Sequence, residues 1–302
     1  MYDVPQQRSS HAAPVLRGAG IAIAPALVIS LVVAASVTLE TSPLLGIAAG
    51  CAAIAAIGIV EDVRGVPIRL RLAGQALIGA ALAGMLLASG NSSWILAVCA
   101  VLLVPVSVNV TNFMDGVDLL SGLHGVVFGV AFSVSGLVLG LDWMWLAGVA
   151  LAVAFGVFLP FNVRARRRMF LGDSGSYLLG GAYAFIGVLA LAAGAPALSV
   201  ATPITIYLAD TATTLVRRIS TGKDWRTSHR EHHYHQLEDL GWPHYAVSVF
   251  VAALSAVCSA IGIWAGSDLA RIAIVIPMLA VIAVAYLRLP SFLRRRIAGA
   301  SK

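Results

Sequence analysis

Residues 46–65 read GIAAGCAAIAAIGIVEDVRG, an apolar run that ends at two neighbouring carboxylates, Glu61 and Asp62. About 20 apolar residues are needed for a helix to cross a bilayer, and the small residues of this run suit close packing between helices. Of the 302 residues, 59% are hydrophobic and 11% are charged. A soluble domain carries roughly 25% charged residues. The sequence therefore predicts an all-α polytopic membrane protein.

Similar apolar runs recur along the chain and predict ten membrane-spanning helices, because lipid-exposed irregular backbone is not tolerated at membrane depth. The predicted spans are 18–38, 42–60, 72–89, 93–109, 122–141, 143–160, 176–193, 197–215, 244–265 and 269–287. The three cysteines, Cys51, Cys99 and Cys258, lie within such runs and are interpreted as small hydrophobic packing residues. The whole chain, 1–302, is predicted to form one integral membrane domain.

The charged residues predict which ends of these helices face the cytoplasm. Of the 20 Lys and Arg residues, all but Arg271 lie on one side of the predicted membrane. Basic residues in short loops stay cytoplasmic, so both termini are predicted in the cytoplasm, and the protein in a bacterial inner membrane. The net charge of +6 follows from this topology and from attraction to anionic lipid, without nucleic acid as a partner. The predicted cytoplasmic loops are 1–17, 61–71, 110–121, 161–175, 216–243 and 288–302.

Most acidic residues lie on or next to this same face, which favours a site that handles metal and phosphate. The pair Glu61 and Asp62 can hold Mg²⁺, or one carboxylate can act as a base while the other stays ionised. The competing interpretation is a solvated loop that pairs with Arg64, Arg69 and Arg71.

A second acidic motif, residues 109–118, directly continues an apolar run. Asn112, Asp115 and Asp118 recur at intervals of three, so a helical continuation is predicted to put them near one face. Carboxylates at membrane depth are costly and usually functional. The alternative is that neighbouring helices merely satisfy these polar groups.

Two further motifs complete the predicted site. Residues 172–176 read GDSGS, in which glycines let backbone approach a phosphate and Asp173 can ligate a metal, although such turns are common at helix starts. Residues 229–235 contain four of the seven histidines, without a cysteine partner or the HExxH arrangement of zinc sites. We interpret these imidazoles and Arg230 as phosphate-binding and proton-handling groups, against the alternative of a solvated basic loop.

Taken in order, these motifs resemble those of the polyprenyl-phosphate N-acetylhexosamine-1-phosphate transferase family, glycosyltransferase family 4. The resemblance covers about residues 8–240 and extends to an N-terminal segment with His11 and to Asp210 followed by Arg217 and Arg218. It implies transfer of a HexNAc-1-phosphate from a UDP-HexNAc to a polyprenyl phosphate, which releases UMP and starts cell-envelope glycan synthesis. Mg²⁺ is the implied cofactor, with Mn²⁺ as a substitute. GlcNAc is the default sugar, and the histidine motif is also similar to that of branches using FucNAc- or QuiNAc-type sugars.

The resemblance also implies roles for individual residues. Asp173 and Asp115 would ligate the metal. Asp62 would be the carboxylate nearest the lipid phosphate, acting either as a base or as a positioning group. The implied catalytic residues are Asp62, Glu61, Asp115, His229 and His232. The implied substrate-binding residues are Asn112, Asp118, Arg230, His233 and His11.

Three departures from the family pattern bear on this interpretation. The chain starts after the position of a helix that the family usually has, Glu61 replaces an aspartate, and Leu119 replaces a glycine, which predicts an altered local backbone. The rival functions are a secondary transporter, an inactive scaffold of the same family and a CDP-alcohol phosphotransferase, whose denser acidic string is not found. The small residues of the helix faces are compatible with a homodimer.

Overall fold

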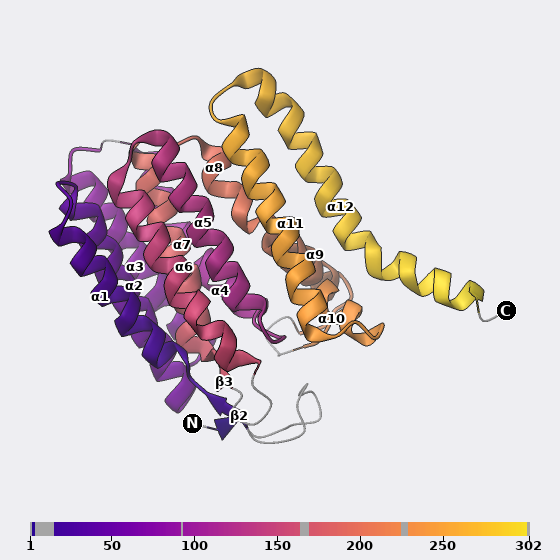
Figure 1. Cartoon of the computed structure of the whole chain (residues 1–302). Helices are drawn as coiled ribbons and strands as arrows, with labels where there is room; N and C mark the ends of the chain where they lie inside the picture. The colour runs from indigo at the N-terminus through magenta and orange to yellow at the C-terminus, as the bar shows by residue number, and fades with distance from the viewer. Residues whose placement is uncertain (1, 4–14, 92, 164–168, 225–228, 301–302) are drawn as a thin grey trace.

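The computed structural model describes residues 2–3, 15–91, 93–163, 169–224 and 229–300. Most of its helices run alongside one another in a bundle, and the last helix diverges from it (Figure 1). The helices are α1 (Gly20–Ser36), α2 (Thr41–Arg64), α3 (Ile68–Ala88), α4 (Trp94–Phe113), α5 (Leu120–Leu139), α6 (Asp142–Asn162), α7 (Gly172–Ala192), α8 (Ala197–Ala201), the 3₁₀ helix η1 (Thr202–Ile204), α9 (Thr205–Ser220), α10 (His233–Asp239), α11 (His244–Ala265) and α12 (Leu269–Ala300). The strands are β1 (Tyr2–Asp3), β2 (Val15–Arg17) and β3 (Met169–Phe170).

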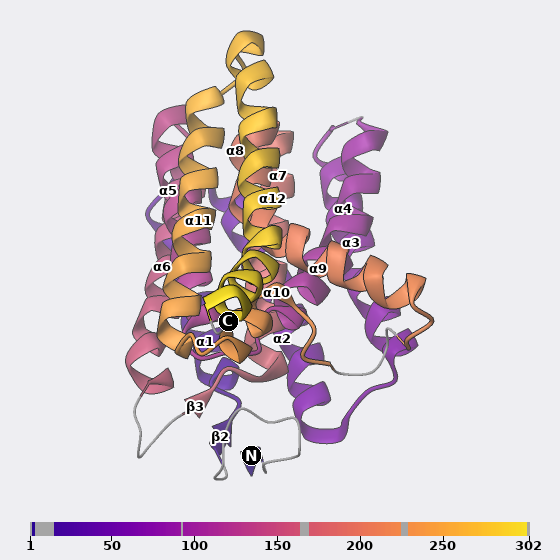
Figure 2. The same ribbon diagram turned by 90° about the vertical axis from the view of Figure 1, so that its right-hand side faces the viewer.

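Within the described ranges, eight helices are long and apolar enough to cross a membrane, which confirms a helical, polytopic membrane protein. These helices are α2, α3, α4, α5, α6, α7, α11 and α12. The apolar helix α1 is shorter, with 17 residues. The predicted span 197–215 is not one helix but is divided into α8, η1 and α9. Pro203 lies in η1, where its missing N–H prevents a continuous α-helical ladder, and α9 then runs across the bundle (Figure 2).

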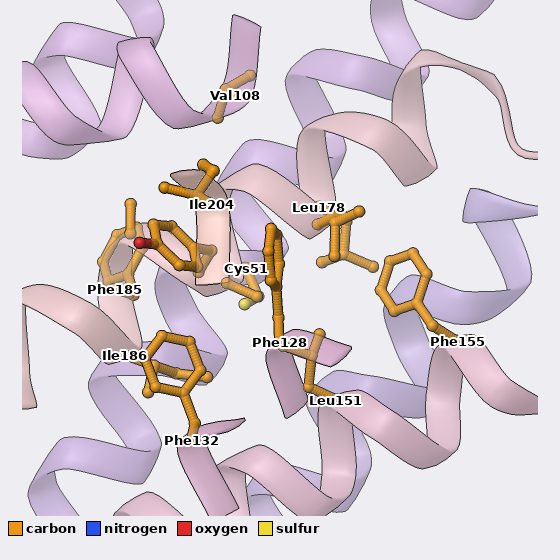
Figure 3. Packing of buried hydrophobic residues seen from close by; sticks show 14 of the residues in the cluster. Cys51, Val108, Phe128, Phe132, Leu151, Phe155, Leu178, Phe185, Ile186 and Ile204 are labelled. Carbon is orange, nitrogen blue, oxygen red and sulfur yellow. The ribbon is translucent and has the colours of Figure 1, made fainter. Parts of the chain in front are cut away.

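Helix α7 lies at the centre of the bundle and is almost entirely buried, in contact with α1, α2 and α4. Side chains such as Phe128, Phe155 and Leu178 fill the core around it, as Figure 3 shows. Glycine allows a close approach of the helices: a Cβ added at Gly58 of α2 would lie 2.5 Å from the Cα of Ser174. The packing therefore fixes where the first turn of α7 lies.

The described parts of the predicted cytoplasmic loops gather at one end of the bundle, together with the strands and α10 (Figure 1). Their cytoplasmic orientation stays a prediction. A small three-stranded sheet, which the all-α expectation did not include, joins segments distant in sequence: β2 pairs with β1 in antiparallel and with β3 in parallel orientation. In the parallel register, Leu16 lies opposite Met169 and Arg17 opposite Phe170, so the sheet brings Arg17 to the start of α7.

The turn before α5 contains Leu119, whose φ of 68° is the only positive value of a non-glycine residue in the described ranges. The Leu119 backbone N–H donates to the side-chain oxygen of Asn162 at 2.5 Å, which holds the turn in place. Leu119 thus takes a left-handed backbone conformation that glycine adopts more readily.

We expect this conformation to be strained, and paired substitutions measure the strain. Leu119→Gly and Leu119→Ala both remove the side chain, so their difference reports on the backbone. The glycine variant should be more stable than the alanine variant by about 1 kcal/mol, because the left-handed region costs alanine more. Thermal unfolding in detergent checks the order. As a control, the same two substitutions at Leu123, inside α5, should show the opposite order of stability. If Leu119→Ala is as stable as Leu119→Gly, the backbone at residue 119 is not strained.

Candidate active site

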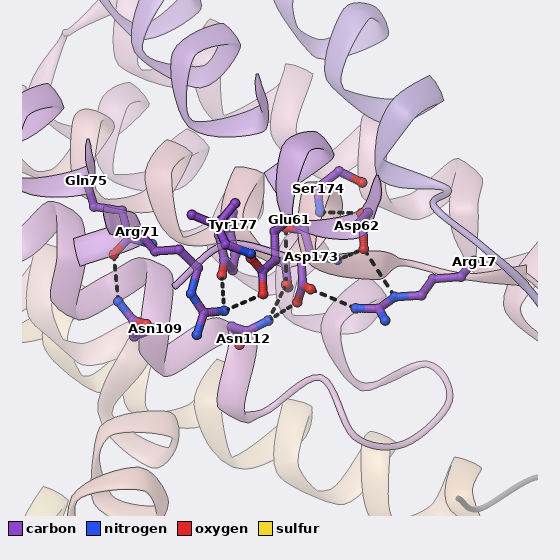
Figure 4. A network of polar contacts seen from close by, with 12 residues as sticks. Arg17, Glu61, Asp62, Arg71, Gln75, Asn109, Asn112, Asp173, Ser174 and Tyr177 are labelled. Atoms are coloured by element: carbon purple, nitrogen blue, oxygen red, sulfur yellow. Dashed lines mark hydrogen bonds and ion pairs between the residues drawn. The ribbon is translucent and has the colours of Figure 1, made fainter. Parts of the chain in front are cut away.

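A polar cluster lies where α2, α3, α4 and α7 end or begin at the loop-bearing end of the bundle (Figure 4). We call it the carboxylate cluster, and its members are Arg17, Glu61, Asp62, Arg71, Asn112, Asp173 and Tyr177. These residues come from three of the motifs in the sequence, from β2 and from the start of α3, so the fold brings distant motifs together.

Asp173 lies in the first turn of α7, and both of its carboxylate oxygens accept hydrogen bonds. Oδ1 accepts from the Asn112 Nδ2 at 2.6 Å, and Oδ2 accepts from the Arg17 Nη2 at 2.7 Å. Asn112 belongs to the last turn of α4 and also donates to the Ser176 Oγ at 3.1 Å. The predicted metal ligand Asp173 and the predicted substrate-binding residue Asn112 are therefore in direct contact.

Asp62 lies beside the same turn, but its side chain is fully buried, with 0% exposed. Its two oxygens accept from the backbone N–H groups of Asp173 and Ser174, each at 2.9 Å. Arg17 Nε lies 3.1 Å from Oδ1. Of the two roles that the resemblance implies for Asp62, base or positioning group, these contacts favour the second.

Glu61 turns away from Asp62 and contacts the start of α3. Its Oε1 lies 2.8 Å from the Arg71 Nη1, and its Oε2 accepts from the Val66 backbone N–H. Arg71 also donates to the Tyr177 hydroxyl at 3.0 Å. The pairing with Arg71 that the solvated-loop interpretation predicts is thus present, in a half-buried setting.

The predicted helical continuation through Asp115 and Asp118 is wrong. Helix α4 ends at Phe113, and the chain forms a turn before α5 begins at Leu120. Asp118 instead contacts the start of α11: its Oδ2 lies 2.9 Å from the His244 Nδ1. A spacing of three residues puts side chains on one face only within a continuous helix. Here the chain turns between α4 and α5, so the spacing does not place Asp115 and Asp118 on one face.

Asp115 remains close enough to the carboxylate cluster to be affected by its charges. Its Oδ1 accepts from the Ser121 hydroxyl at 2.7 Å. Desolvation raises the pKa of the Asp115 carboxyl to about 6, opposed by the Ser121 hydrogen bond, and the negative charge of Asp173 adds to the rise. Asp115 is thus a carboxylate that is half-protonated near pH 6 and that gains most from a bound cation.

A second ion-pair network connects Asp118 to the loop before α11. The His244 Nε2 lies 3.0 Å from the Glu238 Oε1, and the Arg230 Nη2 lies 2.8 Å from the Glu238 Oε2. These contacts lower the pKa of Glu238, through hydrogen bonds from His235 and His244 and the charge of Arg230, which outweigh its desolvation. The predicted substrate-binding residues Asp118 and Arg230 are therefore linked through His244 and Glu238.

Residues 229–235, which we call the histidine segment, are organised by Asp210 of α9. The Asp210 Oδ1 lies 3.0 Å from the His232 Nδ1 and 3.3 Å from the His233 Nδ1. Its Oδ2 accepts from the hydroxyl of Tyr286, on α12, at 2.6 Å. Asp210 also accepts from the backbone N–H groups that begin α10, those of His233 and Tyr234. Asp210 therefore holds both imidazoles at Nδ1, and both residues are buried.

His229 stacks on His232, with ring centroids 5.0 Å apart. Its Nδ1 is buried and has no hydrogen-bond partner within the described part of the chain. Partial burial, together with His232 and the positive charge of Arg218, lowers the pKa of His229 to about 4. His229 is accordingly a neutral hydrogen-bonding group near pH 7.

The histidine segment and the turn after α4 are in contact, which joins the two halves of the site. The Tyr234 hydroxyl donates to the Phe113 carbonyl at 3.1 Å. A Cβ added at Gly116 would lie 2.7 Å from the His235 Nε2. Of the predicted site residues, only His11 falls outside the described ranges.

Carboxylates are the side chains of this site that could bind a metal ion. No group of three or more His, Cys, Asp or Glu side chains that could hold one occurs in the described ranges. Asp173 and Asp115 supply two carboxylates that influence one another electrostatically. Mg²⁺ commonly binds through one or two carboxylates, with water and substrate phosphates as the other ligands. These residues therefore fit Mg²⁺ and not a closed protein cage.

Sequence reasoning did not select four residues that organise the site: Arg17, Asp210, His244 and Tyr286. Arg17 and Asp210 lie within stretches that resemble the family, so the sequence pointed to these residues. It did not indicate which residues they contact. His244 and Tyr286 lie at the start of α11 and inside α12, where an isolated polar residue in an apolar run was the available signal.

The chain is similar in sequence to known proteins. Residues 44–191 match the family described as glycosyl transferase family 4. Three relatives named phospho-N-acetylmuramoyl-pentapeptide-transferase are similar to the chain. The protein of Moorella thermoacetica is 29% identical over 241 residues, that of Bacillus mycoides 32% over 165 residues and that of Shouchella clausii 29% over 221 residues.

These alignments cover only part of each protein. They span 70%, 52% and 67% of this chain in the same order. They span 72%, 48% and 65% of the respective relatives. The matched family region contains Glu61, Asp62, Asn112, Asp115 and Asp173, so it includes most of the carboxylate cluster.

Proposed function

Because the chain belongs to glycosyl transferase family 4 through residues 44–191, we propose that it transfers a phospho-sugar to a polyprenyl phosphate. In finer terms, the donor is a UDP-HexNAc, the product is a polyprenyl-diphospho-HexNAc, and UMP leaves. The membership agrees with the resemblance that the motifs predict. The observation that carries the proposal is the meeting of Asp173, Asn112 and Asp115 with the histidine segment at one end of an apolar helix bundle.

This location suits a reaction between a water-soluble donor and a membrane-embedded acceptor. A nucleotide sugar reaches the loop-bearing end of the bundle from solution, and the phosphate of a polyprenyl lipid lies at the membrane surface. A transporter site would lie near the midplane, often within broken helices. The carboxylate cluster lies instead where α2 and α4 end and α3 and α7 begin, which favours a transferase over the transporter alternative.

Asp173 and Asp115 would hold Mg²⁺, which when bound neutralises charge on the donor diphosphate. Asn112 and Arg17 hold Asp173 in one orientation. Because the His232 Nδ1 faces Asp210, its Nε2 is directed to hold or exchange a proton with a phosphate oxygen. His229, being neutral, contributes a hydrogen bond to phosphate or sugar and no charge.

The direct test is incubation of the purified protein with Mg²⁺, polyprenyl phosphate and a panel of UDP-sugars. We expect UMP release and a lipid diphosphate product with at least one UDP-HexNAc, and loss of both on chelation of the metal. Omission of the polyprenyl phosphate is the control for simple hydrolysis of the donor. If a folded protein releases no UMP with any donor in the panel, the proposal is wrong and the scaffold alternative gains support.

The raised pKa of Asp115 makes metal binding depend on pH. A metal ion binds the carboxylate and competes with the proton, so affinity should fall as pH drops through about 6. For one proton with a pKa of about 6, the dissociation constant should rise about tenfold between pH 7 and pH 5. Binding of Mn²⁺ to the substrate-free protein, followed by the EPR signal of free Mn²⁺, avoids titration of the substrates.

Two variants check that Asp115 is the group responsible. In Asp115→Asn the pH dependence should disappear. Ser121→Ala removes a hydrogen bond that stabilises the charged form, so the fall in affinity should begin at a higher pH. An unchanged profile in Asp115→Asn would assign the titration to another residue.

A further inference from the structure

We propose that Asp62 is a positioning residue that caps α7 from another helix and thereby sets the orientation of Asp173. This inference rests on the proposed function only in its kinetic consequence. The first N–H groups of an α-helix lack partners within the helix and are usually satisfied by the residue at its own N-cap. The N-cap residue of α7 is Leu171, whose apolar side chain makes no such hydrogen bond.

Asp62 supplies the missing acceptors from α2, more than a hundred residues earlier in the chain. Its Oδ1 accepts from the Asp173 N–H and its Oδ2 from the Ser174 N–H, both at 2.9 Å. A carboxylate is also favoured at this place by the partial positive charge of a helix N-terminus. The carboxylate therefore satisfies two backbone donors that would otherwise be buried without partners.

The approach of α2 to α7 explains how Asp62 reaches this position. Gly58 and Asp62 are four residues apart and so lie on one face of α2. The missing side chain of Gly58 lets the backbone of α2 lie against Ser174, as the 2.5 Å separation of an added Cβ indicates. Gly172, with a φ of 77°, likewise leaves room: a Cβ there would lie 2.8 Å from the Asp62 Oδ2.

Arg17 transmits the position of Asp62 to the side chain of Asp173. Its Nε lies 3.1 Å from the Asp62 Oδ1, and its Nη2 lies 2.7 Å from the Asp173 Oδ2. Figure 4 shows this guanidinium between the two carboxylates. Asp62 thus fixes the backbone of Asp173 directly, and it fixes the Asp173 carboxylate through Arg17.

The same contacts argue against Asp62 as a group that reacts with substrate. Three donors occupy its two oxygens, and 0% of its side chain is exposed. To accept a proton from a lipid phosphate, it would have to give up the cap of α7. The chemistry of the site therefore falls to the carboxylates of Asp173 and Asp115 and to the histidine segment.

The first experimental arm needs no turnover. Hydrogen exchange of a peptide over 171–177 is measured for wild type and Asp62→Asn, which removes the charge and one of the two acceptors. We expect exchange at the 173 and 174 amides to accelerate at least about tenfold, with no change over 233–239. Asp268→Asn is the matched control, because Asp268 caps its own helix, α12, through the N–H groups of Ala270 and Arg271. It should leave the 171–177 peptide unchanged.

The second arm separates positioning from catalysis. In Asp62→Asn the Mg²⁺ concentration for half-maximal rate should rise about tenfold, as for losses of residues that orient a metal ligand. The kcat at saturating Mg²⁺ should stay within about threefold of wild type. Arg17→Gln keeps the cap and breaks the bridge, so it should raise the Mg²⁺ requirement without accelerating exchange at 173 and 174.

The outcomes distinguish this inference from the proposed function. Normal exchange in Asp62→Asn, or a kcat that stays about a thousandfold low at saturating Mg²⁺, would overturn the positioning role. Accelerated exchange in a protein whose wild type releases no UMP would support the cap and reject only the proposed function.

Discussion

Asp173→Asn should lower kcat/KM for the transfer about 10³-fold, the largest loss expected from any conservative change in the site. The substitution preserves size and leaves one oxygen to accept from Asn112, but it removes the negative charge that a metal ion needs. Because Asp62 caps the backbone of α7 independently of this side chain, the helix itself should stay in place. Initial rates of UMP release over a range of donor concentrations, at fixed Mg²⁺ and polyprenyl phosphate, give kcat/KM for both proteins.

Asp142→Asn provides the matched control for this substitution. Asp142 also lies in the first turn of a membrane-spanning helix, α6, but at the end of the bundle opposite to the carboxylate cluster. Its loss should leave the rate within about twofold of wild type, as is usual for surface substitutions. Equal rates for Asp173→Asn and wild type would remove Asp173 from the catalytic machinery.

Asp210→Ala should lower the free energy of unfolding by about 3–5 kcal/mol, the range for removing one partner of a buried charged network. The carboxylate is fully buried and accepts from α9, from the start of α10 and from α12. Its removal leaves the His232 and His233 imidazoles and the Tyr286 hydroxyl without their acceptor. The histidine segment should lose its fixed conformation, and the transfer activity should be lost with it.

A smaller change in the same network gives the comparison. Tyr286→Phe removes one hydrogen bond of 2.6 Å and should cost only about 1 kcal/mol. Unfolding of both variants in detergent, followed by circular dichroism, gives the two values. If Asp210→Ala is no less stable than Tyr286→Phe, Asp210 does not organise the segment.

Composition and hydropathy predicted much of this architecture, because a membrane imposes a simple length rule on helices. Eight of the ten predicted spans are long apolar helices, whereas α1 is shorter and 197–215 is divided. The described parts of the polar loops up to residue 243 gather at one end, as the alternation of spans and loops predicts. The order of the motifs predicted that Asn112 and Asp173 belong to one site, but it did not predict that they are in contact. Local sequence does not specify which side chain meets which across 61 residues.

The errors have specific physical causes. Spacing in sequence predicted one helical face for Asp115 and Asp118, but spacing carries this meaning only while the helix continues, and α4 ends at Phe113. The span 197–215 was apolar enough to be predicted whole, yet Pro203 interrupts its hydrogen bonding. The adjacent pair Glu61 and Asp62 suggested shared chemistry, whereas side chains one residue apart on a helix point in different directions.

The parallel pairing of β2 with β3 and the hydrogen bond from Tyr286 to Asp210 have a consequence for biogenesis. The ribosome makes Arg17 long before Phe170, its neighbour in the sheet, and makes Asp210 before Tyr286. A nascent chain that has inserted its first six helices therefore lacks the turn that Asp62 caps. The shell around Asp210 is completed only by the final helix, so a protein truncated during translation would carry most of the motifs and an unfinished catalytic surface.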